Sequence, residues 1–134
     1  YACSKEIIRK YKPFLEELDL TYTQYIVMLV LWENDQINVK QLGEKLYLDS
    51  GTLTPLLKKL EQKNYIHKFK NKTDERNRMI EITKEGQDLK EKAKNIPIQM
   101  GKCLNISKED ANNLYQILYR ILKDINEKDT STID

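Results

Sequence analysis

Two cysteines and one histidine are the first candidates for chemistry in this sequence: Cys3, Cys103 and His67. They lie far apart in the chain, so they lack the short spacing of a zinc site, and two cysteines do not form a disulfide framework. His67 lies in a strand-like pattern without an evident carboxylate or serine partner, and no glycine-rich phosphate loop is present. We therefore predict no enzyme, no metal site and no cofactor. The two thiols remain candidates for redox chemistry.

A second candidate is the beginning of a helix in residues 47–62, YLDSGTLTPLLKKLEQ. Its first turns carry small, hydroxyl-bearing or helix-breaking residues: Ser50, Gly51, Thr52, Thr54 and Pro55. Unpaired amides at a helix N-terminus suit a phosphate, hydroxyl groups add donors, and Gly51 lets backbone come close. Pro55 is tolerated near the start because the first amides lack partners within the helix. Ordinary capping chemistry explains the same residues and, taken alone, is the commoner case.

Basic charge is concentrated in the middle of the chain. From Lys58 to Arg78 there are eight Lys or Arg against three Asp or Glu, an excess of five, whereas the net charge of the chain is +2. The basic residues in this region include Lys58, Lys59, Lys70, Lys72, Arg76 and Arg78. The tip of a basic hairpin can enter a minor groove, and Asp74 could orient Arg76 through a charge-assisted hydrogen bond. Two basic elements beside a small-residue helix start favour nucleic-acid binding over a solvated charged turn.

The hydrophobic pattern predicts a mainly α fold with a small β-hairpin wing. We expect a first helix with a kink or break at Pro13, and a buried second helix capped by Thr21 or Thr23. Two short helices then form a helix-turn-helix, and YIHKFK and RMIEI alternate in the manner of strands. A fifth helix begins near Thr83 and is interrupted or ended by Pro97. The last helix, from Ser107, carries a long apolar stripe.

This order of elements is that of a winged helix inside a helical frame. We predict one domain over residues 1–134, with a winged-helix core at about 37–82 and a helical dimerisation region at about 1–20 and 84–128. The terminal helices carry apolar stripes that need a partner surface, which favours a homodimer over a monomeric bundle. No apolar stretch is long enough to span a bilayer and no leader is visible. These features predict a cytoplasmic protein in which thiols are kept reduced.

Three segments resemble the MarR family of dimeric winged-helix repressors: LTYTQYIVMLVLWE, LGEKLYLDSGTLTPLLKKLEQKNYI and DERNRMIEITKEG. The similarity runs over nearly the whole chain and is strongest to the redox-sensing organic hydroperoxide regulators and their relatives SarZ and AbfR. It implies that a homodimer binds a pseudo-palindromic operator in double-stranded DNA. The reading helix would use the small residues of 50–55, and the wing would use Asp74, Glu75 and Arg76, with Arg76 at the minor-groove position.

The resemblance also implies a thiol that senses organic hydroperoxide. Tyr11 and Tyr22 match two tyrosines that hydrogen-bond the reactive thiol across the dimer, and Tyr1 matches a third. The reactive cysteine itself aligns about one helical turn before Tyr1, so either it stands upstream or Cys3 substitutes for it. Cys103 aligns with the resolving thiol of two-cysteine members. The implied protein is a repressor that leaves DNA when its thiols are oxidised.

Two other hypotheses for the same fold stay open at this point. One is a regulator released by a small aromatic ligand, which would bind in an apolar pocket near Tyr11, Tyr22 and Trp32. The other is a global regulator without direct peroxide sensing. A variant in which both cysteines are replaced by serine separates the first from the redox hypothesis, since only a ligand response would survive.

Overall fold

The computed structural model describes residues 1–131 and follows the predicted order of elements with two additions, a short third strand and a separate helix before the last one. The elements are α1 (Ala2–Glu16), α2 (Tyr22–Glu33), β1 (Gln36–Asn38), α3 (Val39–Leu46), α4 (Ser50–Gln62), β2 (Ile66–Lys70), β3 (Arg78–Ile82), α5 (Lys84–Ala93), α6 (Ile96–Cys103) and α7 (Lys108–Ser131). The chain divides into two units, residues 1–98 and 99–134, each of which is described by itself.

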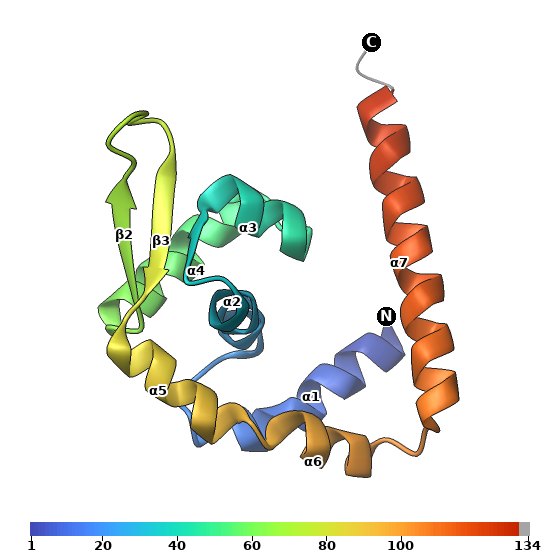
Figure 1. Cartoon of the computed structure of the whole chain (residues 1–134). Coiled ribbons are helices and arrows are strands. Elements are labelled where there is room, and N and C mark those ends of the chain that lie inside the picture. Colours follow the sequence, from blue (N-terminus) through green and yellow to red (C-terminus); the bar gives the residue numbers. More distant parts are fainter. Residues whose placement is uncertain (132–134) are drawn as a thin grey trace. The chain divides into compact units, whose positions relative to one another are not determined.

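Helix α2 is the centre of the N-terminal unit, because its sequence is apolar on every side. Val27, Met28 and Leu31 are fully buried, and α2 contacts α1, α3, α4, α5 and β3 (Figure 1). It begins with a capping box, in which Thr21 and Gln24 each accept a hydrogen bond from the other's backbone amide. Thr21 is therefore the predicted cap. Of the kink or break expected at Pro13, the break is absent, because helix α1 continues through Pro13 to Glu16.

Helices α3 and α4 form the helix-turn-helix, and Gly43 makes their close approach possible. A Cβ atom at this position would lie 2.7 Å from the carbonyl oxygen of Leu48 and 3.2 Å from Cδ1 of Leu53. Tyr47 ends α3 in the left-handed conformation, with a φ of 55°, which turns the chain sharply into α4. The buried face of α4 consists of Leu53, Leu56, Leu57 and Leu60.

The sheet has the strand order β1–β3–β2, and both pairs are antiparallel. We predicted only the hairpin of β2 and β3, which projects from the helices in Figure 1. The strand that we did not predict, β1, is three residues long and pairs Ile37 with Ile80 of β3. Both isoleucines are buried. Three residues are too few to show a two-residue period, so only the partner strand defines β1.

Gly86 packs the start of α5 against the chain between α4 and β2. A Cβ atom there would lie 2.2 Å from the carbonyl oxygen of Tyr65 and 2.9 Å from Cγ1 of Ile82. We therefore expect Gly86→Ala to lower the free energy of unfolding by about 3 kcal/mol through overpacking, measured by urea titration. Gly101 in α6 is the matched control, since no atom lies within 4 Å of its added Cβ. Gly101→Ala should be neutral or stabilising, and equal losses in both variants would contradict the packing assigned to Gly86.

The C-terminal unit contains the end of α6 and the long helix α7. Pro97 is the second residue of α6, so it separates this helix from α5 as predicted. Helix α7 exposes a row of large apolar side chains, each between 44% and 61% exposed: Leu114, Tyr115, Ile117, Leu118, Tyr119, Ile121 and Ile125. Within residues 1–131 there is no helix that combines the length and apolar character required to cross a membrane.

Candidate functional site

The start of α4 presents its small residues to solvent. Ser50, Gly51 and Thr52 are exposed, and the leucines of the same helix face the core. A Cβ atom on Gly51 would meet only Oδ1 of Asp49, at an ordinary 3.6 Å. Packing within the protein therefore does not require glycine here, whereas close approach of another molecule would.

Asp49 is the N-cap of α4 and already occupies one of its free amides. Its Oδ1 accepts a hydrogen bond of 2.7 Å from the backbone N–H of Thr52. Hydrogen bonds from the side chain of Thr52 and, to a smaller extent, from its backbone hold the pKa of Asp49 below the usual range. The amides of Ser50 and Gly51 remain available to a phosphate, because neither has a partner one turn earlier in the helix.

Thr54 and Pro55 also have local roles within α4. The hydroxyl of Thr54 donates to the carbonyl of Ser50 at 2.8 Å, so its proton is engaged within the helix. Pro55 is the sixth residue of α4 and thus lies in the second turn rather than the first. The amide that it lacks would have bonded the carbonyl of Gly51, so this carbonyl loses its usual helical donor at the exposed end.

The basic side chains expected at the interface lie on α4 and on the wing. Lys58, Lys59, Lys70, Lys72, Arg76 and Arg78 are all exposed. Asp74 shapes the wing tip by accepting the backbone N–H of Arg76 at 3.0 Å, and its carbonyl accepts the N–H of Asn77. The carboxylate thus fixes the backbone of Arg76 rather than its guanidinium, which forms no ion pair within the described chain. The guanidinium is left free for an external anion.

The tyrosines of α1 and α2 form a cluster beside the α1–α2 corner. The ring centroids of Tyr11 and Tyr22 lie 5.2 Å apart, and Tyr25 lies 5.8 Å from Tyr11. Tyr25 was not predicted, although it follows Tyr22 by three residues on one helix and such residues share a face. Tyr1 is fully exposed at the start of the chain, with its ring near the Lys5 ammonium, and is not part of the cluster of its own chain.

Burial controls the acidity of these phenols. It raises the pKa of Tyr11, with a smaller contribution from Tyr22, and it also raises the pKa of Tyr22. Burial raises the pKa of Tyr25 to about 12, with smaller contributions from Tyr11 and Tyr22. All three hydroxyls therefore keep their protons at neutral pH and can donate hydrogen bonds to a thiolate or a sulfenate.

The raised pKa of Tyr25 predicts a loss of stability in alkali. A phenol with a pKa near 10 in the unfolded chain and about 12 in the folded chain stabilises the fold fully below pH 10. That contribution disappears as the pH rises toward 12. We expect the free energy of unfolding to fall by on the order of 2 kcal/mol across this range, measured by urea titration. Tyr25→Phe should lose clearly less, and a parallel decline in both proteins would contradict the assignment.

Both thiols are free and exposed in this chain. Cys3 lies in the first turn of α1, and Cys103 is the last residue of α6. Cys3 precedes Tyr11 on the same helix by about two turns, or roughly 12 Å, so we do not expect Tyr11 to hydrogen-bond Cys3 of its own chain.

The cavities of the N-terminal unit include two that lie beside α1 and beside α2 and α3. One, of about 620 Å³, is bordered by α1, the α1–α2 corner and the end of α4; its lining includes Ile8, Leu15, Leu20, Tyr22 and Lys63. Of the three residues near which we expected a ligand pocket, Tyr11, Tyr22 and Trp32, Tyr22 lines this cavity. Trp32 does not line it; it is buried and donates from Nε1 to the carbonyl of Gly86 at 2.9 Å.

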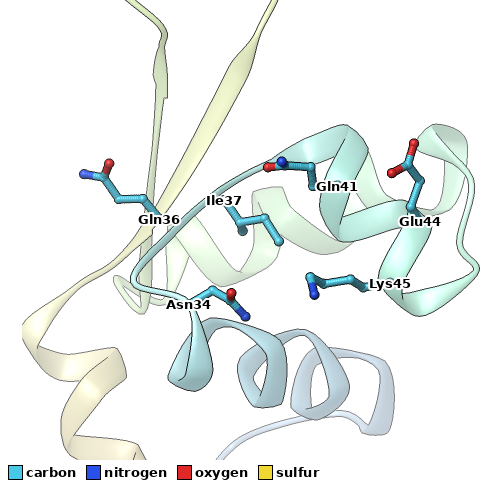
Figure 2. Close-up of a pocket in the computed structure, with 6 residues that line it drawn as sticks. All are labelled: Asn34, Gln36, Ile37, Gln41, Glu44 and Lys45. Atoms are coloured by element: carbon cyan, nitrogen blue, oxygen red, sulfur yellow. The ribbon is translucent and has the colours of Figure 1, made fainter.

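The second cavity, of about 480 Å³, lies where α2, β1 and α3 meet (Figure 2). Three of its polar side chains already serve local structure. Asn34 donates to the carbonyl of Val30, Gln36 donates to Glu81, and Gln41 accepts the backbone N–H of Asn38. The side chains around this cavity thus stabilise a helix cap and the sheet, and none of the predicted site residues lines it.

Comparison with known proteins gives a consistent result. The family model of the transcriptional regulator SarA/Rot matches residues 9–93. An organic hydroperoxide resistance transcriptional regulator of Bacillus subtilis is 45% identical over 131 residues, with 96% of this chain and 87% of that protein covered. The transcriptional regulator SarZ of Staphylococcus epidermidis is 46% identical over 118 residues, with 88% and 80% covered.

Among solved structures, AbfR is similar in several states. Reduced AbfR bound to DNA has a TM-score of 0.79 at 30% identity, with 93% of this chain and 86% of that chain covered. Overoxidised AbfR, which is also bound to DNA, has a TM-score of 0.77 at 30% identity and coverage of 93% and 88%. AbfR with a disulfide formed has a TM-score of 0.71 at 30% identity, with 93% and 85% covered.

Proposed function

Because the chain belongs to the MarR/SarA-type winged-helix transcriptional regulators, we propose that it is a cytoplasmic repressor that binds operator DNA and releases it when a disulfide forms. Proteins of this type regulate transcription and are generally not enzymes. The observation that carries the proposal is the exposed surface formed by the small residues at the start of α4 and by the basic side chains of α4 and the wing. The tyrosine cluster and the exposed thiols supply the redox part.

For DNA binding, α4 would enter the major groove with its N-terminus first, as reading helices do. The amides of Ser50 and Gly51 and the hydroxyl of Thr52 would meet a phosphate and the edge of a base. Lys58 and Lys59 would contact the backbone further along the helix. The free guanidinium of Arg76 at the wing tip would lie in the adjacent minor groove.

The operator is expected to be pseudo-palindromic because the protein would bind as a homodimer. Helix α7 exposes a row of apolar side chains along its length, and such a row is stable in water only against another apolar surface. A two-fold dimer would hold two α4 helices about one DNA turn apart, roughly 34 Å. A change in this distance between the two α4 helices would then be enough to release the DNA.

The thiol chemistry would proceed in two balanced steps. A thiolate attacks the outer oxygen of an organic hydroperoxide and the O–O bond breaks, which gives a sulfenic acid and an alkoxide. The alkoxide takes a proton from water and leaves as an alcohol. The sulfur loses two electrons and the peroxide gains them. The sulfenic acid then condenses with a second thiol to give a disulfide and water. Cys3, or a cysteine upstream of Tyr1, would be oxidised first, and Cys103 of the partner subunit would be the second thiol.

We assign release to the disulfide and not to oxidation of one thiol. Overoxidised AbfR is bound to DNA, so an oxidised sulfur alone is compatible with a DNA complex in that relative. A disulfide between subunits would instead tie the first helix of one chain to the end of α6 in the other. Tyr11 and Tyr22, which keep their protons, would hydrogen-bond the thiolate before reaction and lose that partner afterwards.

The resolving role of Cys103 is tested by electrophoresis without reductant after treatment with cumene hydroperoxide. Wild-type protein should shift to a dimer that dithiothreitol reverses, and Cys103→Ser should stay a monomer on the gel. Mass spectrometry of the treated variant should then find a sulfinic or sulfonic acid at the first cysteine. A dimer band of equal strength in Cys103→Ser would contradict this role.

One observation favours a second candidate function, release by a small aromatic acid. The cavity beside α1 combines apolar side chains with four cationic ones, Lys5, Arg9, Lys12 and Lys63, which outnumber its two carboxylates, Glu16 and Asp19. Benzoate fits that chemistry and serves as the probe. If benzoate releases DNA from a variant with both cysteines replaced by serine, the cavity and not the thiols controls binding.

A further inference from the structure

Lys63 connects the end of the candidate DNA-reading helix to the α1–α2 corner. It is the C-cap residue of α4, and its side chain is only 27% exposed. Its Nζ donates to the backbone carbonyl of Asp19 and to Oε1 of Gln24, the latter at 3.2 Å. The carboxylate of Asp19 lies 3.5 Å from the same ammonium. One cation thus holds three oxygens of a segment that is about 40 residues away in the chain.

The corner that Lys63 contacts is itself tightly specified. Asp19 has a left-handed backbone, with a φ of 53°, a conformation that costs energy for a residue other than glycine. Gln24 is 3% exposed and is the one buried polar residue of the described core. Its Oε1 also accepts the backbone N–H of Thr21 at 3.1 Å. The same oxygen therefore closes the cap of α2 and receives Lys63.

This contact lies between two functional regions. Tyr22, which belongs to the tyrosine cluster, lies within the capping box formed by Thr21 and Gln24. At the other end of α4, roughly 20 Å away, are the small residues proposed to meet DNA. Leucine contacts between helices tolerate sliding, whereas hydrogen bonds from an ammonium to fixed oxygens depend on position and direction.

We propose that Lys63 is a positioning residue that couples the tyrosine corner to the DNA-reading helix. Displacement of Thr21–Gln24 then moves Asp19 and Gln24 against the ammonium and rotates α4 about its C-terminal end. The inference deepens the proposed function, since it names the residue through which oxidation beside Tyr22 reaches DNA. Coupling of this kind commonly changes affinity by about five- to 150-fold.

The test is a double-mutant cycle read by amide hydrogen exchange in the free protein. Thr21→Ala loosens the corner without touching α4, and Lys63→Met removes the ammonium while it keeps an unbranched side chain. In the protein that retains Lys63, Thr21→Ala should raise the amide exchange rates of residues 53–62 by about tenfold relative to those of the core of α2. In the Lys63→Met background, the same change should be less than about threefold. Lys59→Met, on the exposed face of α4, is the control and should leave the tenfold effect intact.

Equal effects of Thr21→Ala in both backgrounds, or a uniform rise across the whole chain, would overturn the coupling. A second measurement separates this from the proposed function: affinity of the same four proteins for a duplex selected by the wild-type protein from random-sequence DNA. If exchange is coupled and the effect of Thr21→Ala on affinity also shrinks in Lys63→Met, both proposals stand. If exchange is coupled but no duplex is selected, or if the affinities do not change, the result would support the role of Lys63 and contradict the role of α4 in DNA binding.

Discussion

Leu118→Asp in α7 should give a monomer with at least a hundredfold weaker affinity for operator DNA. Leu118 is half-exposed and lies in a row with Leu114, Ile121 and Ile125, which recur on one face of the helix. A carboxylate in the centre of an apolar interface would be buried without a partner, which proteins avoid at high energetic cost. A monomer occupies one half-site and loses the advantage of the second, commonly a factor of 10² to 10⁴.

Sedimentation and fluorescence anisotropy with labelled DNA would measure the two effects. Gln116→Glu is the matched control, because it adds one negative charge on the opposite face of α7. It should remain a dimer with nearly unchanged affinity. A Leu118→Asp protein that stays dimeric and binds DNA normally would show that α7 is not the dimer surface.

Arg76→Ala should weaken DNA binding by at least tenfold, the second largest effect of a single change. The guanidinium forms no ion pair within the described residues, and Asp74 holds the backbone of Arg76 in place. A groove-inserted arginine contributes about 1–3 kcal/mol, and a dimer carries two wings. Because the side chain is exposed, the free energy of unfolding should not change.

Substitutions of the wing residue Arg76 and of the lysines on α4 separate the reading of a groove from the attraction between charges. Arg76→Lys should recover only part of the lost affinity, since lysine lacks the planar fork of arginine. Lys58→Ala and Lys59→Ala should weaken binding to all sequences alike and reduce its salt dependence. If Arg76→Ala changes neither affinity nor its dependence on salt, the wing does not contact DNA.

Patterns within a single element allowed most of the fold to be predicted from the sequence. The buried α2, the leucine face of α4 and the caps at Thr21 and Asp49 each depend on neighbours within a few residues. Strand β1 had no such signal, because its three residues are ordered only by pairing with β3, more than forty residues later. Pro55 shows the limit of boundary prediction: Asp49 caps the helix earlier than the proline suggested, so the proline lies in the second turn.

The candidate site likewise combines features that a local sequence pattern predicts with contacts that no local pattern predicts. Exposure of the small residues of α4 follows from the helical period, and the wing follows from the alternation of its strands. The contacts of Lys63 with Asp19 and Gln24 depend on how α4 lies against α2, and no local pattern contains that information. The same holds for the thiols, because the partners that we propose for them lie in a second chain.

The most direct measurement is the affinity of the full-length protein for its selected operator duplex before and after cumene hydroperoxide. We expect tight binding by the reduced protein and at least a hundredfold loss after treatment, which dithiothreitol restores. We also expect treated Cys103→Ser to remain on DNA, since that variant oxidises a thiol without closing the disulfide. Wild-type protein that carries the disulfide and binds the duplex with unchanged affinity would contradict release by disulfide formation.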